Sequence, residues 1–211
     1  MKIFILKAFT LVEVLITLSI IGVVAALTIP ALHNEIQNRQ FKETAKEVFS
    51  KSSQAVQQMK MDEGGSLDYS TKTNGSFFGV FMNYFKIIKI CAPVACVPEV
   101  SQSDIYTSLF GDKADATRGG EGEFVTADGV FFNIQNSINA PLEIIVDVNG
   151  YTKKPNVYGQ DVFMFELVND NLLPMGAKAT SLLAPTYCNP KVSNGLQGVA
   201  CMQYVMQGID Y

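Results

Sequence analysis

The sequence predicts an α+β fold, in which one long N-terminal helix is followed by a small antiparallel sheet. Residues 8–62 carry helical patterning throughout, first as an apolar run and then as an amphipathic stretch. Residues 123–168 carry several short strand patterns separated by turn residues. Strands that follow one another this closely, with short turns between them, pair antiparallel.

The apolar run from Ala8 to Leu32 contains one charged side chain, Glu13. It exceeds the roughly 20 residues that a helix needs to cross a bilayer. Lys2 and Lys7 precede it, so the positive-inside rule predicts a cytoplasmic N-terminus and an exported C-terminal part. A carboxylate within a membrane helix costs about 2.5–3.5 kcal/mol, and Glu13 therefore needs a partner.

Two simpler interpretations explain the apolar run less well. A secretory signal peptide has a shorter apolar stretch than residues 8–32, and its apolar stretch is not interrupted by a charge such as Glu13. A plain single-pass anchor explains the length and the orientation, but it leaves Glu13 unexplained.

From His33 to about Asp62 the pattern becomes that of an amphipathic helix. Residues for the buried face recur at steps of three and four positions; they are Ile36, Phe41, Ala45, Val48 or Phe49, Ser52, Val56 and Met59. Gly64 and Gly65 predict the end of this helix. Pro30 lacks a backbone N–H and predicts a kink or local melting between Gly22 and Pro30, unless it only marks the exit from the membrane.

Four strands are expected in the second half of the chain. They cover Phe124–Thr126, Val130–Ile134, Leu142–Val148 and Asp161–Val168. The Asp128-Gly129 pair predicts a tight turn between the first two strands. Residues 77–85, which are rich in phenylalanine, predict a short buried helix before the sheet.

The cysteines and the net charge restrict the compartment and the partners. The chain has an even number of cysteines, and no two of them form a Cys-x-x-Cys pair; they are Cys91, Cys96, Cys188 and Cys201. This pattern favours disulfides over a zinc site. Cys91 and Cys96 are spaced for a small local loop, and Cys188 and Cys201 for a C-terminal loop. The net charge of −4 gives no support for nucleic-acid binding through a basic surface.

The residues from Lys7 to Glu13, Lys-Ala-Phe-Thr-Leu-Val-Glu, resemble the processing site of type IV prepilins and type II secretion pseudopilins. The resemblance implies that a prepilin peptidase cleaves between Ala8 and Phe9 and that the new N-terminus of Phe9 is methylated. Glu13 stands four residues after Phe9, as in that family. The family usually has Gly before the cleavage site, whereas this chain has Ala8, which carries the next smallest side chain.

The resemblance also implies a domain organisation and a set of partners. Residues 1–8 are a leader, 9–32 the membrane and filament-core helix, 33–63 an amphipathic helix, and 64–211 a globular α+β domain with the sheet and the C-terminal loop. The fold is similar to the pilin fold. Gly22 and Pro30 fall where the family loosens its helix.

In that family the subunit is stored in the inner membrane, with its C-terminal domain in the periplasm, and joins a filament through an inner-membrane assembly platform. Glu13 would then pair with the Phe9 amine of a neighbouring subunit. The function expected is a structural subunit of a type IV pilus or a secretion pseudopilus. The alternative is a single-pass inner-membrane protein with an extracytoplasmic ligand-binding domain.

One loop gathers oxygen ligands of the kind that calcium prefers. This loop contains Asp147, Asn149, Asn156 and Asp161. Their spacing does not match that of an EF-hand. The alternative is that Asn149-Gly150 forms a hairpin turn and Asp161 begins a strand. No other cofactor is expected. No catalytic site is expected either, because the chain's single histidine, His33, lies next to the apolar run.

Overall fold

The computed structural model describes residues 10–67, 77–91, 96–97, 105–114, 122–136 and 141–211. The chain divides into two compact units, residues 1–39 and residues 40–211. The helices are α1 (Leu11–Asp62), α2 (Phe77–Phe81), the 3-10 helix η1 (Met82–Tyr84), α4 (Ala184–Tyr187) and α5 (Met202–Gln207). The strands are β1 (Ile87–Cys91), β2 (Gly122–Thr126), β3 (Phe131–Gln135), β4 (Glu143–Asp147), β5 (Val162–Val168) and β6 (Asn171–Pro174).

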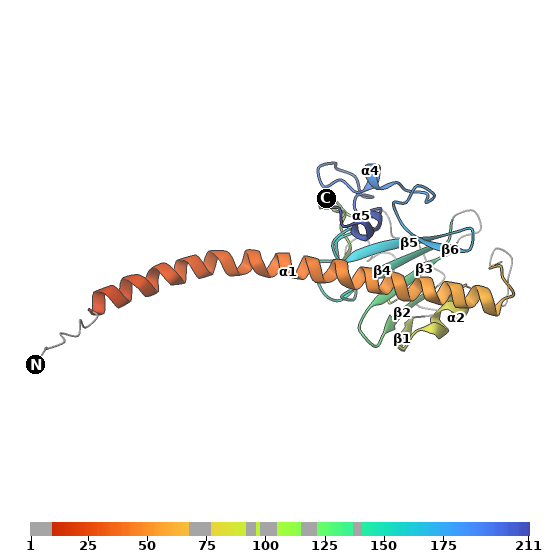
Figure 1. Cartoon of the computed structure of the whole chain (residues 1–211), viewed down its shortest axis with the longest axis horizontal. Helices are drawn as coiled ribbons and strands as arrows, with labels where there is room; N and C mark the ends of the chain where they lie inside the picture. Colours follow the sequence, from red (N-terminus) through yellow and green to blue (C-terminus); the bar gives the residue numbers. More distant parts are fainter. Residues whose placement is uncertain (1–9, 68–76, 92–95, 98–104, 115–121, 137–140) are drawn as a thin grey trace, which may run out of the picture. The chain divides into compact units, whose positions relative to one another are not determined.

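The six strands form one antiparallel sheet in the order β1-β2-β3-β4-β5-β6, so each strand pairs with its neighbours in the sequence (Figure 1). The α+β fold, with a long N-terminal helix followed by an antiparallel sheet, is thereby confirmed. The four predicted strands correspond to β2, β3, β4 and β5. The edge strands β1 and β6 were not predicted.

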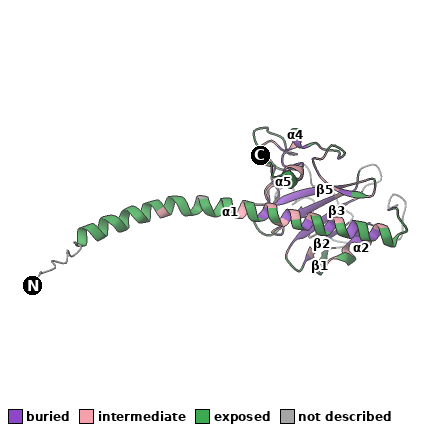
Figure 2. Cartoon of the chain, viewed as in Figure 1, coloured by how far each residue is buried: buried purple, intermediate pink, exposed green. Residues whose placement is uncertain are grey.

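Helix α1 changes its surroundings along its length, as Figure 2 shows. Its large apolar side chains from Leu11 to Leu32 are exposed, whereas Phe41, Ala45 and Val48 are buried. The buried series continues with Ser52, Val56 and Met59, as the three- and four-residue periodicity predicted, and it also includes Ala55. Ile36, which was predicted for the same face, is exposed instead. The helix ends as predicted: Gly64 and Gly65 have positive φ, and the Gly65 amide donates to the Lys60 carbonyl.

The prediction of local melting between Gly22 and Pro30 is wrong for this chain. Helix α1 is continuous from Leu11 to Asp62 and contains Pro30 in its interior. Proline removes one backbone donor. Because every other residue of the surrounding turns keeps its own N–H, the loss of one hydrogen bond leaves the helix intact.

The sheet is covered on both faces, which explains why its central strands are apolar almost throughout. One face contributes Phe124, Phe132, Val146 and Phe163 to a core that contains the buried residues of α1 and α2. The register places these four residues in one row across the sheet. The opposite face packs its own residues, including Ile145 and Met164, against Tyr106, Tyr158, Met175 and Val199.

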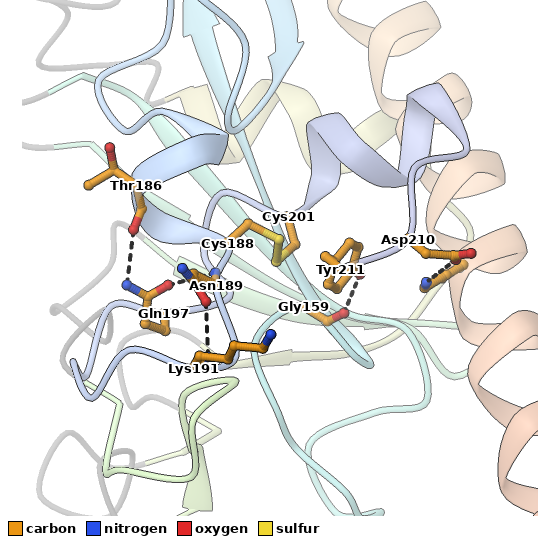
Figure 3. The surroundings of a disulfide bond; sticks show 10 residues. Gly159, Thr186, Cys188, Asn189, Lys191, Gln197, Cys201, Asp210 and Tyr211 are labelled. Carbon is orange, nitrogen blue, oxygen red and sulfur yellow. Dashed lines mark hydrogen bonds and ion pairs between the residues drawn. A yellow bond between two sulfur atoms is a disulfide. The ribbon is translucent and has the colours of Figure 1, made fainter.

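A disulfide between Cys188 and Cys201 joins the end of α4 to the start of α5 (Figure 3). Gln197 lies in the loop between them, where its side chain accepts the Asn189 amide proton and donates to the Thr186 carbonyl. The Tyr211 hydroxyl donates to the carbonyl of Gly159, which belongs to the connection between β4 and β5. The last residue of the chain is therefore fastened to that connection.

We expect the double variant Cys188→Ser, Cys201→Ser to lose about 3 kcal/mol of unfolding free energy. The two cysteines are 13 positions apart, and releasing a loop of that size gives the unfolded chain this much additional conformational freedom. Denaturant unfolding of the full chain in detergent, followed by circular dichroism, measures the loss.

The double variant Cys91→Ser, Cys96→Ser is the matched control. This disulfide spans 5 positions, so its removal should cost less. A larger loss from the shorter loop would contradict the explanation by loop entropy.

Candidate functional site

The first candidate site is the N-terminal end of α1. The leader, residues 1–8, and the expected cleavage site between Ala8 and Phe9 lie outside the described residues. Thr10 is the first described residue and stands at the N-cap position, directly before the helix.

Thr10 and Glu13 form a reciprocal capping box. The backbone N–H and the hydroxyl of Thr10 donate to Glu13 Oε2 at 2.9 and 2.8 Å, and the Glu13 N–H donates to Thr10 Oγ1 at 3.2 Å. A Thr-x-x-Glu box satisfies backbone donors that the first turn of a helix leaves without partners. Glu13 therefore has a partner in its own chain. The Thr-x-x-Glu spacing from Thr10 to Glu13 is the signal in the sequence that indicates this contact.

Only one oxygen of the Glu13 carboxylate is used in this way. All the hydrogen bonds described for this side chain end on Oε2. Glu13 Oε1 takes part in none of those contacts, so it can accept a bond from a further donor while the capping box stays intact.

The surface around Glu13 is mostly apolar. The exposed apolar side chains of this segment include Leu11, Leu15, Leu18, Ile21 and Leu27. Among the described residues, α1 is the one helix long and apolar enough to cross a membrane by length and composition, although a signal sequence also passes that test. An apolar surface of this extent needs a covering of lipid or protein.

Gly22 and Pro30 lie within this segment of α1. A Cβ atom at Gly22 would meet no other atom of the chain within 4 Å, so packing inside the chain does not require glycine there. A role for this glycine would therefore concern the conformation of the helix backbone or a contact with another molecule.

The second candidate site is the connection between β4 and β5, residues 148–161, which Asp147 and Asp161 bracket. Both carboxylates are fully buried. Asp147 Oδ1 accepts the backbone N–H groups of Asn149 and Gly150 at 3.2 and 2.9 Å. Its Oδ2 accepts the Tyr106 hydroxyl at 3.2 Å, a partner distant in sequence that sequence patterns do not reveal.

Asp161 accepts two backbone donors on its two oxygens, the N–H of Asn156 at 2.8 Å and that of Val157 at 2.7 Å. Burial raises the pKa of Asp161. Burial and then the charge of Asp161 raise the pKa of Asp147 to about 7. The charge of Asp161 thus opposes the ionisation of Asp147.

This connection is not a two-residue hairpin, although Asn149 and Gly150 do turn the chain. Gly150 has φ +86°, and β5 begins only at Val162, one residue after Asp161. The structure thus brings the four predicted oxygen ligands into one loop. Among the described residues, no three His, Cys, Asp or Glu side chains come together as a metal site. A cation here would depend on amide and backbone oxygens as well.

The four cysteines are paired within the described residues as Cys91–Cys96 and Cys188–Cys201. Glu123 of β2 lies beside the first pair, and its Oε2 accepts the backbone N–H groups of Cys96 and Val97. Burial raises the pKa of Glu123, and these N–H groups partly offset the effect. Glu123 thereby fixes the small loop to the sheet.

The comparisons with known proteins identify the N-terminal site. Residues 7–29 match the family described as the prokaryotic N-terminal methylation motif. The match includes Ala8, Phe9, Glu13 and Gly22. No curated protein and no solved structure matches the chain. The chain therefore carries, ahead of its α+β domain, the N-terminal methylation motif that is the signature of type IV pilins and pseudopilins, proteins whose precursors are processed by prepilin peptidase.

Proposed function

We propose that this protein is a structural subunit of a type IV pilus or a type II secretion pseudopilus, and that it polymerises through residues 9–32. The observation that carries the proposal is an apolar helix, exposed on all sides, with one carboxylate near its start. Lipid would cover this surface while the subunit is stored, and neighbouring subunits would cover it in the filament.

Cleavage between Ala8 and Phe9 would supply the charge that Glu13 needs. The new amine of Phe9 is positive and stands at the start of the helix. We infer that the amine of one subunit binds Glu13 Oε1 of its neighbour, while Thr10 keeps hold of Oε2 in the same chain. In apolar surroundings such a charge pair fixes the register, because subunits that dock out of step bury an unpaired charge.

The proposed location follows from the same segment. The uncleaved chain would lie in the inner membrane with Lys2 and Lys7 in the cytoplasm and the domain after residue 33 in the periplasm. Its partners would be prepilin peptidase, the inner-membrane assembly platform, and other pilins. Gly22 and Pro30 would let the helix bend as subunits pack, since neither residue stabilises a helix.

The proposed role is that of a building block, without catalytic turnover. His33, the chain's single histidine, belongs to α1 and lies outside the unit that contains the sheet. A pocket of about 490 Å³ does lie in that unit, lined by Val48, Phe85, Val130 and Phe132 among others. Its charged lining residues include Lys51 and Asp128, which form an ion pair at 3.5 Å.

The mass of the mature protein tests the proposal. We expect a polypeptide that begins at Phe9 and carries one additional methyl group. The measurement is intact mass spectrometry of the protein purified from membranes of a strain that has a prepilin peptidase. A strain without the peptidase, as control, should yield the uncleaved chain. An intact Met1 start in both strains would instead support the single-pass membrane protein with a ligand-binding domain.

A further inference from the structure

The pocket of about 490 Å³ lies within the unit formed by residues 40–211, and residues 9–32, which the proposed filament contacts use, do not line it. Its volume falls within the roughly 300–1,000 Å³ that small-molecule sites occupy. Val48 of α1 and Val130 and Phe132 from the second strand of the β2–β3 hairpin line the pocket and are almost fully buried. These three residues give the pocket an apolar floor.

Two aromatic residues that precede β1 form a wall of this pocket. Tyr84 and Phe85 both line it, and Tyr84 is 37% exposed, so part of its side chain is open to contact. The Phe85 ring lies 5.0 Å from that of Phe132, and the Tyr84 hydroxyl donates to Asp62 Oδ2 at 2.7 Å. These contacts hold both rings in place. Aromatic walls pack well against a flat apolar group, through stacked or edge-to-face contacts.

Contacts between separate elements fix the rim of the pocket. The backbone N–H of Ala127, in the turn between β2 and β3, donates to the carbonyl of Lys86 at 2.7 Å. Lys51 of α1 reaches Asp128 of the same turn at 3.5 Å. All four residues line the pocket. A ligand would therefore enter a preformed site, which lowers the entropy cost of binding.

The charged residues of the lining leave one positive charge unbalanced. Lys51 binds two carboxylates, those of Glu47 at 2.9 Å and Asp128 at 3.5 Å. Lys86 lines the pocket and is exposed, and in the described part of the chain it belongs to none of the ion pairs. An anionic group on a ligand would balance this charge at the solvent edge of the pocket. A cationic group would meet two lysines and a carboxylate that is already paired.

We propose that this pocket binds a small aromatic carboxylate. The aromatic ring would lie against Tyr84 and Phe85 over the apolar floor, and the carboxylate would pair with Lys86. Sites of this kind combine mostly apolar walls with a few polar groups that fix the orientation of the ligand. The proposal goes beyond the role in a filament, because every lining residue belongs to the folded unit and binding needs no neighbouring subunit.

Ligand titration of the full chain in detergent tests this proposal, with 3-phenylpropionate as the probe. Saturation-transfer NMR follows binding, and protein-free detergent provides the blank. We expect a dissociation constant on the order of 1 mM, as suits so small a ligand. The alcohol 3-phenylpropanol has the same apolar body without the charge and should bind about two- to fivefold more weakly. Acetate, which has the charge without the body, should show no measurable binding.

Three variants locate the binding site. Lys86→Gln should weaken 3-phenylpropionate about two- to fivefold and leave the alcohol unchanged, because it removes only the charge. Tyr84→Ala should weaken both probes about two- to tenfold, because it removes part of a wall. Lys89→Gln is the matched control: Lys89 is also an exposed lysine, but its ammonium binds the Tyr151 hydroxyl at 3.0 Å and it does not line the pocket. It should keep full affinity for both probes.

Three results would overturn the proposal. The first is no binding of 3-phenylpropionate at about ten times the expected dissociation constant. The second is equal affinity for the acid and the alcohol, which would remove the role of Lys86. The third is an equal effect of Lys86→Gln and Lys89→Gln, which would place the bound anion elsewhere on the surface. Because the measurement uses unassembled protein, none of these results depends on whether the chain forms filaments.

Discussion

In a Glu13→Leu variant, we expect the precursor to insert into the membrane normally while filament assembly is lost. Leucine suits an apolar helix, so insertion does not suffer. In the filament, the neighbour's Phe9 amine would be buried without its carboxylate, which costs about 3–5 kcal/mol at each contact. That cost lowers the association constant of each contact by roughly two to four orders of magnitude. The measurements are alkaline extraction of membranes and the amount of filament sheared from cells.

Two further variants separate the charge of Glu13 from its capping role. Glu13→Gln keeps an acceptor for Thr10 but removes the charge, and it should be nearly as defective as Glu13→Leu. Thr10→Ala removes the capping box but keeps the carboxylate, so it should lose only about 0.5–2 kcal/mol at the end of the helix. Normal filaments from Glu13→Gln would show that charge pairing does not drive assembly.

A Gly198→Ala substitution should destabilise the globular unit by more than about 4 kcal/mol. Gly198 has φ +101°, where side chains are strained, and its added Cβ would lie 2.0 Å from the Tyr158 carbonyl oxygen. That carbonyl belongs to the connection between β4 and β5, so relief of the clash would separate this connection from the C-terminal loop. We expect Tm to fall by about 8–16 °C in thermal unfolding of the full chain.

Gly111→Ala is the control that separates backbone strain from the clash. Gly111 has φ +105°, nearly the same conformation, but a Cβ there would meet no atom within 4 Å. It should lose only about 1–3 kcal/mol. If the two variants lost equal stability, the contact between Gly198 and Tyr158 would contribute nothing and backbone strain would explain the whole effect.

The sequence predicted the parts of the fold in which burial imposes a regular pattern. Helix α1 and strands β2 to β5 carry such patterns, because their buried residues repeat at three to four positions or form apolar runs. The edge strands β1 and β6 lack them. Ile88 and Ile90 of β1 are exposed, and β6 is a short strand that ends at Pro174. An edge strand buries fewer side chains, so burial leaves less of a pattern in its sequence.

The candidate sites show the same limit. Glu13 could be singled out because a carboxylate in an apolar run is rare, and its local partner Thr10 stands three residues away. The four oxygen-bearing side chains predicted as calcium ligands, Asp147, Asn149, Asn156 and Asp161, could also be named, because they lie near one another in the sequence. The contact of Tyr106 with Asp147 joins residues 41 positions apart, and no local pattern predicts such a contact.

The order of the strands has a consequence for how the sheet folds. Among strands β2 to β6 the longest connection is the one formed by residues 148–161. The connection between β1 and β2 is longer and covers residues 92–121. Closing a longer loop costs more chain entropy, and proteins with local contacts fold faster. We therefore expect the β2–β6 meander to form first and β1 to join it afterwards. The part of the sheet nearest to α1 in the sequence would then be completed last, although the ribosome makes it first.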